Sequence, residues 1–287
     1  MTFSKRRIDV TISLGKGKLG NEQGPDVTLS GRCVSAEIPV HAAGDRMQLL
    51  LQIYGLDQEM MNRLTTIGPI MDERREMNRV SVHAGSDVDP PSLAYEGDII
   101  KAWADYDKAP DSVLTVMAQV AGAKEVKPAR PRSYPGAAPA QEVMREIATS
   151  MGYVCERTGK DIVLANPYFS GTAMDQLRSC AQAARVNYTI DRGVLSIWPA
   201  DGHREGDPIP MSPDTGLIGY PAFTSGGLML KTLYNPHLCV GKRVHVTSSL
   251  QPAQGEWIIT SLAHKLEAEV PDGVWQSTVM CKRNLDG

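Results

Sequence analysis

The sequence has few aromatic residues and no strong excess of charge. Phe occurs three times, and Phe, Trp and Tyr together make up 6% of the 287 residues. Lys and Arg number 30 against 33 Asp and Glu, which gives a formal net charge of −3. A free-standing nucleic-acid-binding domain usually carries a basic excess, so the composition argues against that class. The chain is long enough for about two domains and a sizeable core.

Disulfide and membrane patterns are also missing. The five cysteines are odd in number and scattered, and they form no CxxC pair: Cys33, Cys155, Cys180, Cys239 and Cys281. No apolar run approaches the roughly 20 residues of a membrane span. The basic stretch Lys5–Arg7 resembles the start of a signal peptide, but Asp9 interrupts the apolar run that would have to follow. We therefore expect reduced, mostly buried thiols and a chain that is made and kept in a cytoplasm.

Motifs of nucleotide and ester chemistry are weak or missing. Neither a GxSxG nucleophile elbow nor a Walker A motif occurs. Gly15–Gly20 matches GxGxxG after a predicted strand, but a dinucleotide site needs a helix to begin there. Asn21–Pro25 follows instead and predicts a loop. We interpret Gly15–Gly20 as a mobile basic loop suited to touching a neighbour, rather than as a cofactor site.

Histidine offers little support for a metal site. The six histidines are His41, His83, His203, His237, His245 and His264. Only His237 has a nearby thiol, Cys239, whereas a zinc site would need two such local pairs. His245 and His264 fall on predicted strands and could face each other. The favoured interpretation is that the histidines are structural.

Two aspartate pairs offer candidates for cation binding or proton transfer. Asp87 and Asp89, and likewise Asp105 and Asp107, are spaced to share one face of a strand. Asp89–Pro91 favours a turn instead, and the second pair sits where a strand is expected to end. We therefore predict no catalytic, cofactor-binding or metal-binding residue.

Glycine and proline are plentiful, and they favour many short strands joined by turns. The 26 Gly and 19 Pro make up about one residue in six, against roughly 12% in an average protein. Apolar residues alternate with the two-residue period of half-buried strands. The strands predicted in the first part of the chain lie at 8–14, 34–40, 47–53, 79–84, 99–104 and 113–121. One helix interrupts them, with Asp57 as its cap, with Leu56, Met60, Leu64 and Ile67 on one face, and with Gly68-Pro69 at its end.

The amino-acid composition changes at Lys124–Pro135, which contains three prolines among basic residues. This composition predicts an extended, solvated linker and the best domain boundary. A basic segment could touch nucleic acid, but this one lacks the interleaved aromatic residues of such sites.

The middle of the chain predicts a small αββαββ domain with a weak internal repeat. Pro139 opens one helix and Gly152 ends it. Thr172 caps the second helix, with Asp175 three residues on as in a capping box.

The last part is again β, with strands predicted at 228–234, 243–249, 256–264 and 274–282 after a proline-rich crossing at Asp207–Pro213. The predicted fold class is therefore mainly β (α+β). The predicted domains are a β domain at 1–123 with one short helix, a linker at 124–137, an inserted α+β domain at 138–200 and a second β domain at 201–287. Without a predicted active site, this organisation favours a structural role over an enzyme.

A series of short motifs, each present once, is spread over nearly the whole chain. They are Arg7–Val10, Leu51–Asp57, Met61–Thr66, Leu164–Gly171, Asp175–Leu177, Gly193–Pro199, Thr215–Pro221, Tyr234–Leu238, Gly255–Thr260, Leu262–Glu267 and Gly273–Trp275. In this order they resemble the baseplate hub protein of contractile-tailed bacteriophages, the tube-to-spike adaptor family. The motifs are structural, so the resemblance carries no catalytic residue across.

The resemblance implies two tube-like β-barrel or sandwich domains per subunit, with the insert set to the outside. Three subunits would form a homotrimeric ring of six similar units. Such a ring joins a six-fold tail tube to a three-fold spike and lets genomic DNA pass without specific binding. The implied partners are the tube, spike, tape measure and other baseplate proteins, and no cofactor is implied. The implied place is the baseplate of the virion tail, after synthesis in the cytoplasm of the bacterial host.

Two alternatives stay open. The hub could also carry a cell-wall hydrolase activity, although no separate catalytic domain is predicted. The insert could instead be a binding module for another baseplate protein or a sugar. Its aromatic residues are Tyr153, Tyr168, Phe169, Tyr188 and Trp198. The favoured interpretation is that they form the core of the insert.

Overall fold

The structure is a computed structural model that describes residues 5–13, 26–41, 47–65, 78–106, 112–122, 124 and 127–284. The fold is mainly β, as predicted. By its internal contacts the chain forms two compact units, and each is described by itself. Unit 1 holds residues 1–39, 47–122 and 264–276, and unit 2 holds residues 40–46, 123–263 and 277–287. The three domains and the linker predicted along the chain divide it in another way and stay a prediction.

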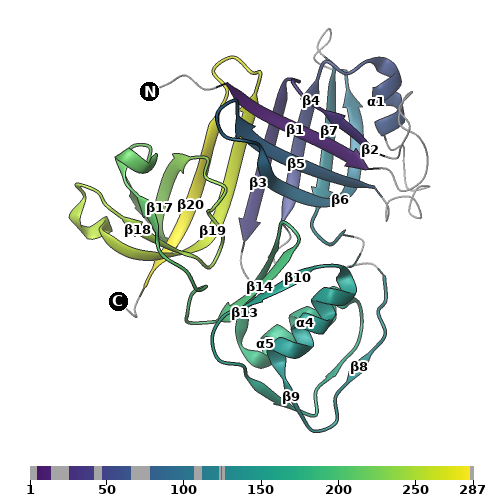
Figure 1. The fold of residues 1–287 in the computed structure, drawn as a ribbon, viewed down its shortest axis with the longest axis vertical. Coiled ribbons are helices and arrows are strands. Elements are labelled where there is room, and N and C mark those ends of the chain that lie inside the picture. The colour runs from purple at the N-terminus through teal and green to yellow at the C-terminus, as the bar shows by residue number, and fades with distance from the viewer. Residues whose placement is uncertain are drawn as a thin grey trace. The chain divides into compact units, whose positions relative to one another are not determined.

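Unit 1 is built on an antiparallel sheet (Figure 1). Its strands are β1 (Arg6–Ser13), β2 (Asp26–Leu29), β3 (Val34–His41), β4 (Gln48–Tyr54), β5 (Arg79–Ser86), β6 (Ser92–Asp105) and β7 (Val113–Gln119). Their order is β3-β4-β7-β6-β5-β1-β2, and β19 (Gly255–Ala268) lies beside β3. The predicted alternation is confirmed, because Ile8, Val10 and Ile12 are buried while their neighbours in β1 are not. The short strand β2 was not predicted, since four residues are too few to show a period.

The predicted helix is present as α1 (Gln58–Leu64). The Asp57 carboxylate accepts a hydrogen bond from the Met60 backbone N–H at 2.7 Å, as expected of a cap. Leu56 and Leu64 are buried, as the predicted face requires, and Met60 is half-buried. Met61, which was not assigned to this face, is buried as well. The rest of the prediction, at 67–69, lies outside the described residues.

The C-terminal strands pair with one another within the same 13-stranded sheet. They are β15 (Ile209–Met211), β16 (Ala222–Thr224), β17 (Gly227–Leu233), β18 (Arg243–Val246), β19 and β20 (Trp275–Arg283). Their order is β16-β17-β20-β19-β18-β15. The four predicted strands are confirmed, whereas β15 was not predicted, because it lies inside the proline-rich crossing. It pairs in parallel with β18 and puts Pro210 opposite His245, a position that suits an edge strand because proline donates no ladder hydrogen bond.

The insert contains α4 (Ala140–Met151), β10 (Val154–Arg157), β11 (Val163–Ala165), β12 (Tyr168–Phe169), α5 (Ala173–Ala184), β13 (Val186–Asp191) and β14 (Val194–Pro199). Its predicted helix ends are confirmed. Gly152 closes α4 with a φ of 88°, and Thr172 and Asp175 form a reciprocal capping box at α5. The two halves of the repeat pair differently, however. The strands β13 and β14 form a hairpin, whereas β10 pairs in parallel with β14 and β11 pairs with β9 (Ala137–Pro139).

Most described residues of 124–137 are exposed, as expected of a solvated linker, but the segment is paired with another part of the chain, which was not predicted. The strand β8 (Arg132–Ser133) pairs with β12, and β9 pairs with β11. Pro128 forms a bridge with Thr172, and the Ala140 N–H donates to the Ile162 carbonyl at 2.8 Å. Residues 128–140 and 162–172 therefore form a two-stranded antiparallel ribbon, called the ribbon below. Composition indicates only solvation here, yet alternate residues turn toward the helices, and Ala138 is fully buried.

Both helices of the insert contact each other and also the strands on either side of them. In Figure 1 they lie between the sheet β10-β14-β13 and the ribbon strands β8 and β9. Within the described residues, no helix has the length and apolar character needed to cross a bilayer.

Candidate functional site

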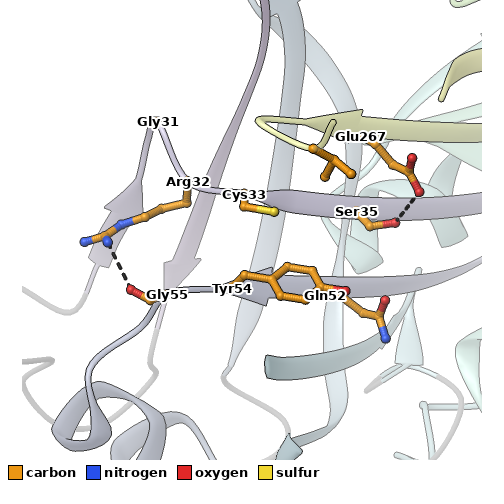
Figure 2. A pocket seen from close by; sticks show the side chains of 9 residues that line it. Gly31, Arg32, Cys33, Ser35, Gln52, Tyr54, Gly55 and Glu267 are labelled. Atoms are coloured by element: carbon orange, nitrogen blue, oxygen red, sulfur yellow. Dashed lines mark hydrogen bonds between the residues drawn. The ribbon is translucent and has the colours of Figure 1, made fainter. Parts of the chain in front are cut away.

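A recess of about 610 Å³ opens in unit 1 at β3, β4 and the turn that follows β19 (Figure 2). Its lining residues are Gly31, Arg32, Cys33, Ser35, Gln52, Tyr54, Gly55, Glu267 and Val270. The side chains are mostly polar and come from strands far apart in the sequence. The recess is therefore the candidate for a binding or catalytic site in this unit.

The polar groups of the recess hold the sheet together. Glu267 Oε1 accepts a hydrogen bond from Ser35 Oγ at 3.3 Å, and Glu267 Oε2 accepts one from the Val274 backbone N–H at 2.8 Å. The Arg32 guanidinium donates to the Gly55 carbonyl at 3.0 Å. Figure 2 shows the Ser35 and Arg32 hydrogen bonds as dashed lines. A catalytic base must reach a nucleophile or a substrate proton, whereas this carboxylate ties β19 to β3 and to the start of β20.

The turn interpretation of Asp87 and Asp89 is confirmed. Both lie between the end of β5 and the start of β6. Asp87 Oδ1 accepts a hydrogen bond from the Lys5 backbone N–H at 2.8 Å, and the Asp89 N–H donates to Ser86 Oγ at 2.9 Å. Asp105 ends β6, while Asp107 and the GxGxxG stretch at 15–20 lie outside the described residues.

His237 lies in a turn, and His245 and His264 lie on strands. The backbone N–H of His237 donates to Asn235 Oδ1 at 2.9 Å. His245 is exposed and stands opposite Glu256 in the register of β18 and β19, while His264 is buried on β19. Across the ranges that the structure describes, no three His, Cys, Asp or Glu side chains gather in a way that could hold a metal ion.

The aromatic residues of the insert divide into a buried set and one exposed member. Phe169, Tyr188 and Trp198 are buried, which confirms the core interpretation for these three. Tyr153 is half-buried. Tyr168 stands out because 63% of its surface is exposed, so it is available to a partner.

Arg192 fastens the insert to the loop that follows β17. It occupies the turn between β13 and β14 with a φ of 49°. Its guanidinium donates to the Pro236 carbonyl at 2.6 Å and to Cys239 Sγ at 2.8 Å, and it also pairs with Asp191. The thiol of Cys239 is thus part of a packing contact, which the sequence could not reveal because 47 residues separate it from Arg192.

Arg204 makes a second attachment. Its side chain is 7% exposed and forms an ion pair with Glu156 Oε2, which also accepts a hydrogen bond from Ser196 Oγ at 3.3 Å. The Arg204 backbone N–H donates to the Gly241 carbonyl at 2.8 Å. The Glu156 carboxylate and, at 3.5 Å, the Val240 carbonyl replace part of the water that the guanidinium loses on burial. Insert and C-terminal strands are therefore joined within unit 2 by side chains as well as by the chain itself.

The sequence matches the family described as Baseplate hub gp41 over residues 7–276. The chain belongs to this family. Membership confirms the predicted resemblance and a structural role in the bacteriophage tail, and it indicates a place in the tail of the virion. No curated protein sequence matches the chain at a significant level.

Solved structures share the fold of this hub protein at low sequence identity. A tail protein from Neisseria meningitidis MC58 is 11% identical, with a TM-score of 0.64 over 96% of this chain and 97% of its own. The 43 kDa tail protein of prophage MuSo2 from Shewanella oneidensis is 12% identical, with a TM-score of 0.62 over 98% and 99%. An Escherichia coli component of the type VI secretion system, itself described as similar to the T4 tail proteins gp27 and gp5, is 12% identical, with a TM-score of 0.56 over 87% and 73%.

Proposed function

We propose that this baseplate hub protein forms a homotrimeric ring that joins the six-fold tail tube to the three-fold spike. Genomic DNA passes through the ring without specific binding, and the protein works without catalysis. Its neighbours are the tube protein, the spike protein and other baseplate proteins, with the tape measure protein as a further contact. In this proposal 1–123 and 201–287 are the tube-like domains, 138–200 is set to the outside, and the chain is made in the host cytoplasm.

The observation that carries the proposal is membership of the baseplate hub family over nearly the whole chain. Both compact units are built on antiparallel strands, so three chains would bring six β units to one ring. A cyclic ring with heterologous contacts closes on itself, and its closure pairs sheet edges that would otherwise promote aggregation. The relatives also include VgrG chains in complex with PdpA, which supports a hub that meets further proteins.

The experiment is a reconstruction of the purified tail, combined with light scattering of the isolated full chain. We expect three copies at the junction of tube and spike and a molar mass of three times 31.2 kDa. A junction built of six copies, or a tail that lacks this chain at the junction, would contradict the proposal. A zone of clearing on a peptidoglycan gel, produced by the purified chain, would contradict the non-enzymatic part.

A further inference from the structure

The ribbon carries a long uncharged surface on the outside of the insert. Every exposed residue in 131–139 and in 162–170 is uncharged. Val163 is 60% exposed and Tyr168 is 63% exposed, while most of the other exposed positions are small: Pro, Ala, Ser and Gly. Arg132, the charged residue of these stretches, is only half-exposed and donates to Ser150 Oγ at 3.0 Å.

The lack of exposed charge on this surface excludes partners that bind through ion pairs. Nucleic acid is bound chiefly through Lys and Arg contacts to phosphate, and the exposed positions at 131–139 and 162–170 offer none, although Arg130 is exposed just before them. Exposed apolar surface on a soluble chain commonly marks a protein contact, so the surface suits an uncharged, apolar patch of another protein chain.

The same chain carries such a patch on a different element. The stretch Leu217–Gly227 contains no charged residue. The Ile218 N–H donates to the Lys231 carbonyl at 2.7 Å, and Ala222 pairs with Met229. Between these two pairings, the three residues 219–221 lie opposite the single residue Leu230. They therefore form a bulge beside β17.

The bulge presents an aromatic anchor. Tyr220, in the bulge, is 77% exposed, and the flanking Ile218 and Phe223 are 39% and 53% exposed. The Phe223 ring meets Trp257 edge to face, with centroids 6.2 Å apart, which fixes the base of the projection. Residues 218–223 are called the tyrosine bulge below.

We propose that the tyrosine bulge of one copy packs on the ribbon of the next copy. The two surfaces are distinct, and both remain exposed in the single chain, so neither is used within it. One projects a large aromatic side chain, and the other is lined mostly by small residues that allow close approach. The exposed positions at 131–139, 162–170 and 218–223 carry no charge, so packing these stretches together buries no unpaired ion. A contact between two different surfaces of identical chains closes a ring only when the rotation between copies allows it. The threefold rotation comes from the proposed trimer, and this inference therefore rests on it.

The direct test places a photo-crosslinking phenylalanine analogue at position 220 of the full chain. Ordinary and ¹⁵N-labelled copies are mixed before irradiation, so that mass spectrometry separates crosslinks between copies from those within one copy. We expect crosslinks between copies to peptides that contain 131–139 or 162–170. The matched control carries the analogue at Tyr106, which is 51% exposed in unit 1, and it should leave the ribbon unlabelled. Crosslinks from position 220 to any other surface, or in purified tails to another tail protein, overturn the assignment.

A second test uses charge. Tyr220→Glu and Tyr168→Glu should each weaken trimer formation at least tenfold in sedimentation, because a carboxylate would be buried without a partner. Gln182→Glu is the control, since this exposed residue of α5 lies outside both surfaces, and it should leave the trimer unchanged. Each variant should unfold at the same temperature as the parent when monomeric, because the substituted side chains are exposed. A trimer that withstands both Tyr variants overturns this inference and leaves the proposed function standing, whereas a parent chain that never associates contradicts both.

Discussion

Gly241 lies directly under the indole ring of Trp198. A Cβ atom added at Gly241 would stand 2.8 Å from Trp198 Cε2, closer than real Cβ atoms approach a ring carbon. The residue also has a φ of 85°, where side chains other than hydrogen are strained. Close approach and backbone conformation therefore both require glycine where the insert meets the C-terminal strands.

Gly241→Ala should lower the free energy of unfolding of unit 2. The left-handed backbone costs about 1–2 kcal/mol with a side chain, and the clash with Trp198 adds about 1–3 kcal/mol of overpacking. Gly193→Ala is the matched control, because Gly193 has a φ of 79° but nothing within 4 Å of its added Cβ. The free energy of unfolding in urea should fall by more for Gly241→Ala than for Gly193→Ala. Equal losses would mean that the indole does not pack on Gly241 in solution.

Arg192→Gln should loosen the attachment of the insert. The glutamine side chain is too short to span the Pro236 carbonyl and the Cys239 thiol together, so a half-buried carbonyl and a buried thiol lose a charged donor at a cost of roughly 1.5–3 kcal/mol. Lys160→Gln removes an exposed positive charge from the same domain and should cost less than about 0.5 kcal/mol. Thermal unfolding compares the two, and similar melting temperatures would contradict the role of Arg192.

Burial protects three of the five thiols. It raises the pKa of Cys180 and of Cys281 to about 12, and Cys239 is buried beside Arg192. Burial also raises the pKa of the half-buried Cys155. Because the thiolate is the reactive form, iodoacetamide at pH 8 should modify Cys33 and, more slowly, Cys155 in the folded protein, and none of the other three. In urea all five should react. Peptide mass spectrometry reads the result, and rapid native labelling of Cys180 would contradict the packing of α5.

Stability should fall at high pH through Tyr134. Burial, together with a 2.7 Å hydrogen bond from its hydroxyl to Glu146, raises the pKa of Tyr134 from 10.0 to about 12. Between these values the unfolded chain loses the proton and the folded chain keeps it, so rising pH favours unfolding. The free energy of unfolding should therefore drop more steeply from pH 10 to pH 12 in the parent than in Tyr134→Phe. Below pH 10 the two curves should run parallel, and equal slopes throughout would refute the shift.

Local features of this fold could be predicted from the sequence, while contacts between distant residues could not. The alternation of buried residues around Ile8 and the capping box at Thr172 and Asp175 depend only on residues a few positions apart. Both could therefore be predicted from the local sequence. The ribbon pairs two segments about 30 residues apart. The contact of Arg192 with Cys239 has no local motif, and Tyr220 projects only because residues on another strand set the register.

The ribbon also decides where this protein can be divided. A deletion of the predicted insert, 138–200, would remove 162–172. It would leave 128–137 without the strand that pairs with it. The remaining stretch would present a row of unpaired backbone groups, which invites association with other chains. Arg204 would likewise lose Glu156 and keep a buried charge. A graft or truncation of the insert should therefore be cut near 127 and 204 rather than at the ends of the helices and strands.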